Sequence, residues 1–143
     1  MKIILVLLTV LFPLLAFAQT ENTIPKTGLY AFETSAGMKV GAAFGVLSGG
    51  DTDDQLLSVT STVSPRIEIH EMKDVNGIMQ MRQVASMPIK KNTENKLGPM
   101  GYHLMLMDLN APLQKGTNIP VTLLFKNAGE KKMNIPVLAR QAK

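Results

Sequence analysis

From Thr20 onward, apolar and polar residues alternate in short runs of the kind that form β-strands. Runs rich in Val, Ile, Leu and aromatic residues recur about every eight to twelve residues, and Gly, Pro, Asn and Asp separate them. No stretch keeps the 3.6-residue apolar period of a helix over three turns. We expect strands at 28–33, 40–47, 55–62, 66–73, 78–84, 102–109, 119–125 and 133–137. About eight short strands predict an all-β sandwich with Greek-key connections.

The first 18 residues follow a different pattern. A basic start at Lys2 precedes an apolar run, and a small-x-small sequence that suits signal peptidase follows it at residues 16–18. We expect a cleaved signal peptide at 1–18, although an uncleaved anchor helix is the alternative. No cysteine follows the run, so we expect no lipid anchor at that position. The remaining 19–143 predict one domain, with its core at about 28–138.

Composition excludes several function classes. The chain has 15 Lys and Arg against 11 Asp and Glu, a net charge of +4 that falls to +3 without Lys2. Basic pairs such as Lys90-Lys91 have no aromatic residues between them, so we expect no nucleic-acid partner. With no cysteine, the chain lacks a thiol nucleophile, a cysteine zinc site and a blue-copper centre. Methionine, in contrast, occurs ten times.

The chain has two histidines, and each lies in an expected strand beside methionine. Strand alternation places His70 on one face with Glu68 and Met72. The same alternation places His103 on one face with Met105. Each histidine can therefore bind the same metal ion as a neighbouring thioether.

A hairpin turn at Asn76-Gly77 brings a third methionine to the first histidine strand. A four-residue loop over 74–77 would put His70 directly opposite Met81. A two-residue loop at Asn76-Gly77 would put Met72 opposite Met81, with His70 as its diagonal neighbour. Both registers leave His70 and Met81 on one face, and the sequence does not choose between them.

Two thioethers and two imidazoles suit Cu(I) better than zinc, magnesium or calcium. The donors are neutral, so the bound ion would bring a charge of only +1 into a partly apolar pocket. The alternative is structural, because a strand methionine is more often a packing residue and a single histidine a hydrogen-bonded surface residue. Spacing alone does not decide which methionines bind; the other candidates are Met72, Met79, Met87, Met100 and Met107.

The spacing His70, ten residues, Met81, twenty-one residues, His103, one residue, Met105 resembles that of the periplasmic copper chaperone family PCu(A)C. The segments "IEIHEM", "GIMQMR" and "GYHLMLMDLNAPLQKGTNIPVTLLF" resemble its ligand strands, and the likeness covers about 28–138. It implies a cupredoxin-like β-sandwich that binds one Cu(I) per chain through these four residues. It also implies a periplasmic location and delivery of copper to the binuclear copper centre of cytochrome c oxidase.

The chain departs from the family pattern in three places. Phe32 and Thr34 in "AFET" stand where the family usually has Trp and Arg, which changes packing but no ligand. Met100 interrupts the usual Pro-Gly-Gly before the signature strand, where we expect packing or exposure rather than a transfer ligand. The end of the chain at 139–143 lacks the His- and Met-rich tail of some relatives, so we expect a single site.

We therefore expect a monomeric Cu(I) metallochaperone that passes its ion to an apo copper-acceptor protein. The alternatives are copper sequestration without a dedicated acceptor, and a metal-free β-sandwich binding module. An enzyme is not expected, because both histidines are committed and carboxylates such as Glu68 and Glu71 are more plausible as solvated groups. Glu68 could orient the ring of His70, although water or a backbone carbonyl is the commoner partner.

Overall fold

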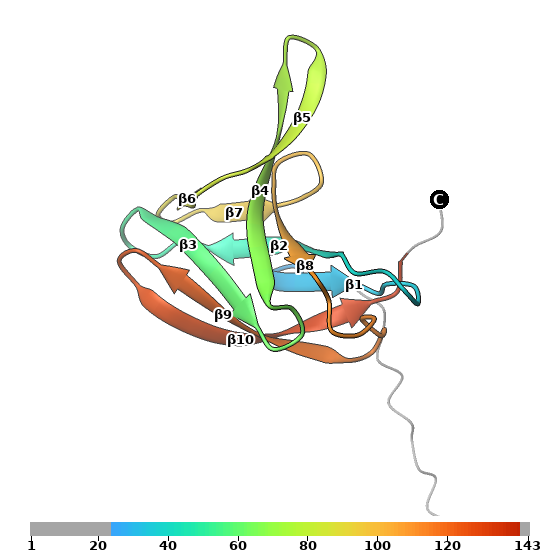
Figure 1. Ribbon diagram of the computed structural model, residues 1–143. Helices are drawn as coiled ribbons and strands as arrows, with labels where there is room; N and C mark the ends of the chain where they lie inside the picture. The colour runs from blue at the N-terminus through green and yellow to red at the C-terminus, as the bar shows by residue number, and fades with distance from the viewer. Residues whose placement is uncertain (1–23, 141–143) are drawn as a thin grey trace, which may run out of the picture.

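The computed structural model describes residues 24–140, so the expected signal peptide at 1–18 lies outside the described residues. Ten strands make up the fold (Figure 1). They are β1 (Gly28–Phe32), β2 (Gly41–Ser48), β3 (Asp54–Ser61), β4 (Arg66–Val75), β5 (Ile78–Gln83), β6 (Met87–Ile89), β7 (Glu94–Leu97), β8 (Tyr102–Met107), β9 (Asn118–Phe125) and β10 (Gly129–Leu138). Residues 24–140 contain no helix, and hence none that could span a membrane. The all-β prediction is confirmed.

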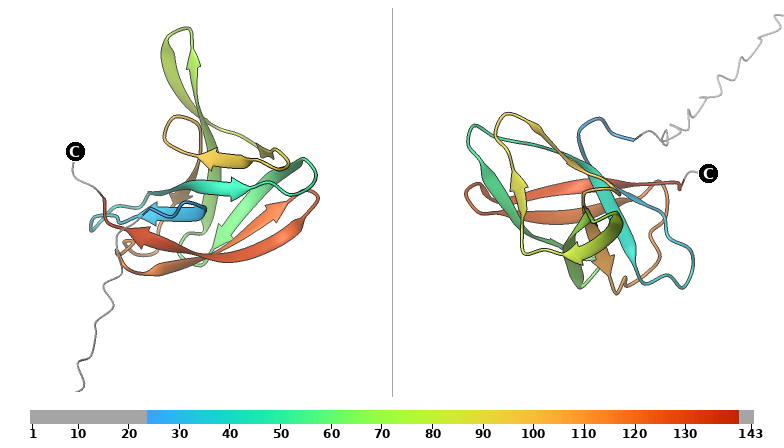
Figure 2. Two further views of the ribbon diagram at one scale, coloured as in Figure 1. Left: turned by 180° about the vertical axis from the view of Figure 1, so that it is seen from behind. Right: turned by 90° about the horizontal axis from the view of Figure 1, so that it is seen from above.

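The strands form one continuous sheet that curls into two facing layers (Figure 2). Its strand order is β5-β4-β8-β7-β2-β1-β10-β9-β3-β6, with β8 also paired to β2. The parallel pair of β1 and β10 joins the two layers. Alternate residues point between the layers and form the core, among them Leu56, Leu104, Leu106, Leu123 and Ile135. The residues on the outer face of β4, β8 and β2 are therefore not needed for the core between the layers.

Two short strands were not predicted, which raises the count from about eight to ten. β6 has three residues with Pro88 at its centre, and proline weakens a strand signal. The sequence of β7 is typical of a polar loop, although Asn95 and Leu97 point inward in the structure. The side-chain amide of Asn95 takes up its buried position by bonding the carbonyls of Leu47 and Lys90 and the backbone N–H of Lys90.

The hairpin of β4 and β5 projects as an arm beyond the rest of the sheet (Figure 1). Its loop is the two-residue Asn76-Gly77, because Val75 pairs with Ile78. Both loop residues have positive φ, 56° and 81°, as a type I′ turn requires. Met72 consequently pairs with Met81 and His70 with Gln83, so the two-residue alternative is the observed register.

The Asp54 side chain links β3 to the loop between β9 and β10 through hydrogen bonds. Desolvation acts to raise the pKa of its carboxyl, but backbone N–H donors of Asn127, Gln55 and Ala128 bond the carboxylate and lower the pKa below the ordinary 3.8. A lowered folded-state pKa favours the folded state above the unfolded-state pKa, and this contribution disappears as pH falls through the folded-state value.

We therefore expect Asp54→Asn to lower the melting temperature at pH 7 and to match the wild type near pH 2. In strong acid the wild-type carboxyl is protonated and resembles the amide. Thermal unfolding of both proteins across this pH range measures the effect. An equal difference at both pH values would contradict an ionic origin.

Candidate metal centre

His103 is the most deeply buried of the predicted ligands, with 4% of its surface exposed. It lies on β8 between β4 and β2. Its Nδ1 lies 3.2 Å from the carbonyl oxygen of Gly101. A carbonyl can only accept, so Nδ1 carries the proton and Nε2 of the neutral ring has a free electron pair. The fold thus fixes the tautomer that a metal ligand needs.

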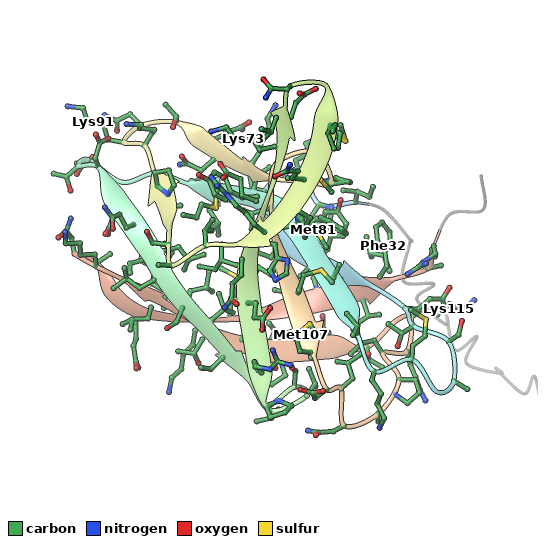
Figure 3. All side chains as sticks on the ribbon, turned by 45° about the horizontal axis from the view of Figure 1, so that its top comes forward. Phe32, Lys73, Met81, Lys91, Met107 and Lys115 are labelled. Carbon is green, nitrogen blue, oxygen red and sulfur yellow. The ribbon has the colours of Figure 1, made fainter. Side chains whose placement is uncertain are left out.

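Met81 meets this free nitrogen. Its Sδ lies 3.3 Å from His103 Nε2, and Figure 3 shows Met81 where the β4-β5 arm joins the sheet. Both atoms offer electron pairs, and such an approach is favourable when a cation lies between them. Zinc sites give a reference distance for two donors on one tetrahedral ion: bonds of about 2.0 Å to imidazole and 2.3 Å to sulfur leave the N and S atoms about 3.5 Å apart. The observed separation of 3.3 Å is close to this value. Met81 is 50% exposed, so the sulfur is accessible from solvent.

His70 lies on β4 directly opposite His103, with the ring centroids 5.8 Å apart. Its Nε2–H donates to Glu68 Oε2 at 2.7 Å. Among the side-chain N and O atoms of the described residues, Nδ1 of His70 is the buried one that has no hydrogen-bond partner. A buried nitrogen without a partner is unfavourable in an apolar setting, and its free electron pair suits a metal.

Met105 is the fourth predicted ligand, two residues beyond His103 on the same face of β8. It pairs with Glu68 on β4 and Ala42 on β2. The structure therefore brings Met81 to His103 through close atoms, His70 to His103 through neighbouring rings, and Met105 through its strand position. Residues 24–140 contain no group of three or more His, Asp or Glu side chains that could hold a metal. The donor set fits a soft ion.

Glu68 links the site to a surface ion-pair chain. Arg66 bonds its other carboxylate oxygen and also reaches Asp108 at 3.1 Å. The hydrogen bond from His70 lowers the pKa of Glu68; desolvation opposes this effect, and the Arg66 charge adds to it. The expectation that water or a backbone carbonyl orients His70 was wrong, because the carboxylate two residues away does so.

On the sequence prediction that His70 is a Cu(I) ligand, we expect Glu68→Gln to lower Cu(I) affinity by about tenfold, because partners that orient a ligating histidine are typically worth 10–100-fold. The amide keeps a hydrogen-bond acceptor for His70 but removes the negative charge near the ion. Anaerobic titration against a Cu(I) chelator measures the change. Glu94→Gln, on the exposed end of β7, is the matched control, and an equal loss in both variants would exclude a specific role for Glu68.

Sequence reasoning missed the aromatic residues next to the site. The ring centroid of Phe44 on β2 lies 6.2 Å from that of His103. The ring centroids of Phe32 and Tyr30 lie 6.0 and 6.2 Å from that of Phe44. Phe32, noted above as a departure from the family pattern, therefore contacts the site through one intervening ring. Strand alternation indicates the outer face for Phe44, but only the pairing of β2 with β8 brings it to His103.

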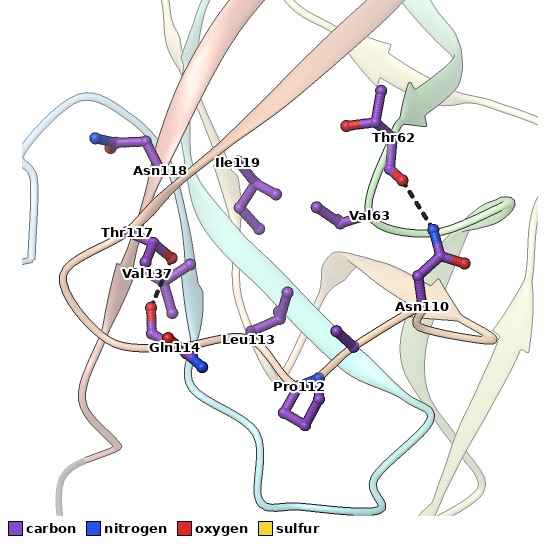
Figure 4. Close-up of a pocket in the computed structure, with 11 residues that line it drawn as sticks. Thr62, Val63, Asn110, Pro112, Leu113, Gln114, Thr117, Asn118, Ile119 and Val137 are labelled. Atoms are coloured by element: carbon purple, nitrogen blue, oxygen red, sulfur yellow. Dashed lines mark hydrogen bonds between the residues drawn. The ribbon is translucent and has the colours of Figure 1, made fainter.

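A separate cavity of about 370 Å³ lies between the loops after β3 and β8, the start of β9 and the end of β10 (Figure 4). Its walls include Val63, Pro112, Leu113, Ile119 and Val137. No lining residue is His, Met or charged. The cavity therefore offers no imidazole, thioether or carboxylate donor and shares no lining residue with the candidate metal centre.

Comparison with known proteins identifies one family and several solved structures of the same fold. The model of a family described as "Putative lipoprotein LpqE-like" matches residues 24–137. A putative lipoprotein of Leifsonia xyli subsp. xyli is 34% identical over 109 residues, which are 75% of this chain. The chain spans 66% of that relative's length.

Solved structures share the fold. The apo PCuAC domain from PmoF1 has a TM-score of 0.67 and 21% identity, covering 82% of this chain and 98% of that domain. The copper-bound PCuAC domain from PmoF2 has a TM-score of 0.66 and 18% identity, covering 82% and 97%. At these identities the likeness shows the fold, and it confirms the resemblance that the sequence predicted.

Proposed function

The chain belongs to the LpqE-like family, and from that premise we propose that it is an exported protein that binds one Cu(I) and delivers it by ligand exchange. The ligands we propose are His70, Met81, His103 and Met105. The mature protein is the single domain 19–143, released from the signal peptide 1–18 into the periplasm. The lipoprotein description of the family and of its Leifsonia relative supports export.

The approach of Met81 Sδ to His103 Nε2, 3.3 Å away, is the observation that carries the proposal. Packing alone gives no reason to point a nitrogen with a free electron pair at a thioether, which is itself an acceptor. A bound cation gives both atoms a partner. The unpaired Nδ1 of His70, on the facing strand, supports the same conclusion.

The donor chemistry favours Cu(I) over other ions. Thioether sulfur is soft, and Cu(II) would prefer more nitrogen and oxygen donors. None of the four donors needs a negative charge, so the pocket acquires a single positive charge that Glu68 can balance from 2.7 Å behind His70. The copper-bound PCuAC domain from PmoF2, which has the same fold, is consistent with this choice of metal.

Delivery requires an incoming ligand to reach the ion before the last donor leaves. The exposed Met81 offers that access, whereas the buried His103 holds the ion from the inner side. We propose an apo copper protein as the acceptor, for example the subunit that carries the binuclear copper centre of cytochrome c oxidase. No redox step is needed, and we assign the protein no catalytic role.

Anaerobic titration of the mature chain with Cu(I) against a chelator tests binding. We expect one tightly bound ion per chain. Weak binding that ignores substitution of His103 and Met105 would favour a metal-free binding module instead.

Transfer experiments separate delivery from sequestration. The loaded protein is mixed with the apo copper subunit of an oxidase or with a small chelator of equal affinity. We expect faster transfer to the protein acceptor, since docking orients the two sites. Equal rates would indicate sequestration without a dedicated acceptor.

A further inference from the structure

The β4-β5 arm carries two methionines that the proposed site does not use. Met72 pairs directly with Met81, and Met79 lies two residues before Met81 on β5. Residues directly opposite each other in an antiparallel pair share a face, as do residues two apart in one strand. The three thioethers therefore lie on one face of the arm, beginning at the candidate metal centre.

The register brings these side chains close together. The N–H of Val84 donates to the carbonyl of Ile69, and bonded pairs alternate along an antiparallel ladder. Met72 and Met81 therefore form a non-hydrogen-bonded pair, in which Cα atoms are about 4.5 Å apart. Met79 is the diagonal neighbour of Met72, about 7–8 Å away and within reach of flexible side chains.

Exposure and charge also favour a soft cation here. Met79 is 43% exposed and β5 is exposed along its whole length, so core packing does not explain the thioethers of Met79 and Met81; Met72 on β4 is half-buried. An edge strand more often carries lysine. Strand alternation puts Lys73 and Arg82 of the arm on the opposite face, whereas Asp74, the direct partner of Met79, shares the methionine face. The charged side chain beside these sulfurs on the arm is therefore a carboxylate, which favours a cation.

We propose that Met72, Met79 and Met81 form a second, outer Cu(I) position that binds more weakly than the four-ligand site, and that Met81 belongs to both positions. An ion entering on the arm binds the three thioethers first. It then exchanges the sulfur bonds of Met72 and Met79 for nitrogen bonds to His103 and His70 and a sulfur bond to Met105, while Met81 stays attached. Copper remains Cu(I) throughout, each new bond uses the electron pair of the incoming donor, and no proton moves. The inward direction rests on the proposed function; the outer position itself does not.

Methionine methyl NMR tests the proposal. The full mature chain is labelled with ¹³C at the methionine methyl groups and titrated anaerobically with Cu(I) supplied as its acetonitrile complex. We expect the first equivalent to shift Met81 and Met105, and the second to shift Met72 and Met79. Unmoved signals of Met72 and Met79 at two equivalents would overturn the outer position. Unmoved signals of Met81 and Met105 at one equivalent would instead count against the proposed function.

A double variant supplies the second measurement. Met72→Leu with Met79→Leu keeps side-chain volume and leaves Met81 in place. We expect it to bind the first Cu(I) with wild-type affinity and to lose the second. Met133→Leu, at a half-buried methionine on β10 in the other layer, is the control and should keep both. Retention of the second ion by the double variant would also overturn the proposal.

Discussion

His103→Ala should lower Cu(I) affinity by at least about a hundredfold, beyond the 10–100-fold typical when only a ligand's supporting partner is lost. His103 supplies the nitrogen that faces Met81 and is held by the Gly101 carbonyl. Without this nitrogen, the remaining donors lack the buried ligand whose position the fold fixes. Anaerobic competition with a chelator measures the affinity, and circular dichroism checks that the protein remains folded.

His103→Asn separates ligand loss from unfolding. Its amide N–H can still bond the Gly101 carbonyl, so the buried polar position keeps a partner. We expect it to retain the wild-type melting temperature more closely than the alanine variant, with an equally weak affinity. Wild-type Cu(I) affinity in this folded variant would remove His103 from the ligand set.

Met81→Leu should lower Cu(I) affinity by about tenfold to a hundredfold, a loss of about 1.4–2.8 kcal/mol of binding free energy. Leucine has similar volume, and the side chain is half exposed, so stability should change little. The same chelator competition measures the loss.

Met133→Leu is again the matched control for Met81→Leu, because it removes a thioether from the other layer. Its affinity should equal that of the wild type. If Met81→Leu also matches the wild type, the close approach of Met81 to His103 is packing and not ligation.

The sequence predicts most of the eight main strands because their inward residues alternate clearly; β5, which is exposed throughout, is indicated instead by the Asn76-Gly77 turn before it. β9 shows this pattern, with Ile119, Val121, Leu123 and Phe125 all buried. It does not predict β7, because Asn95 is buried through a hydrogen bond to the distant Leu47 carbonyl, and a polar residue in the sequence gives no sign of such burial. It also misses the start of β10 at Gly129, where exposed charged residues follow the turn.

The candidate site divides in the same way. Alternation along one strand predicts which face His70 and His103 occupy, since that depends on local geometry alone. The direct pairing of His70 with His103 depends on how β4 and β8 meet, which no local pattern contains. The hydrogen bond of His103 to the carbonyl of Gly101 depends on the shape of the turn before β8.

The exposure of Met81 has a chemical consequence outside copper transfer. An oxidant that reaches its sulfur converts the thioether to a sulfoxide, which is polar, chiral and coordinates through hard oxygen rather than soft sulfur. Bound copper would occupy the electron pair that the oxidant attacks. The empty protein is therefore the more vulnerable form, and a methionine sulfoxide reductase in the same compartment would restore its ability to take up an ion.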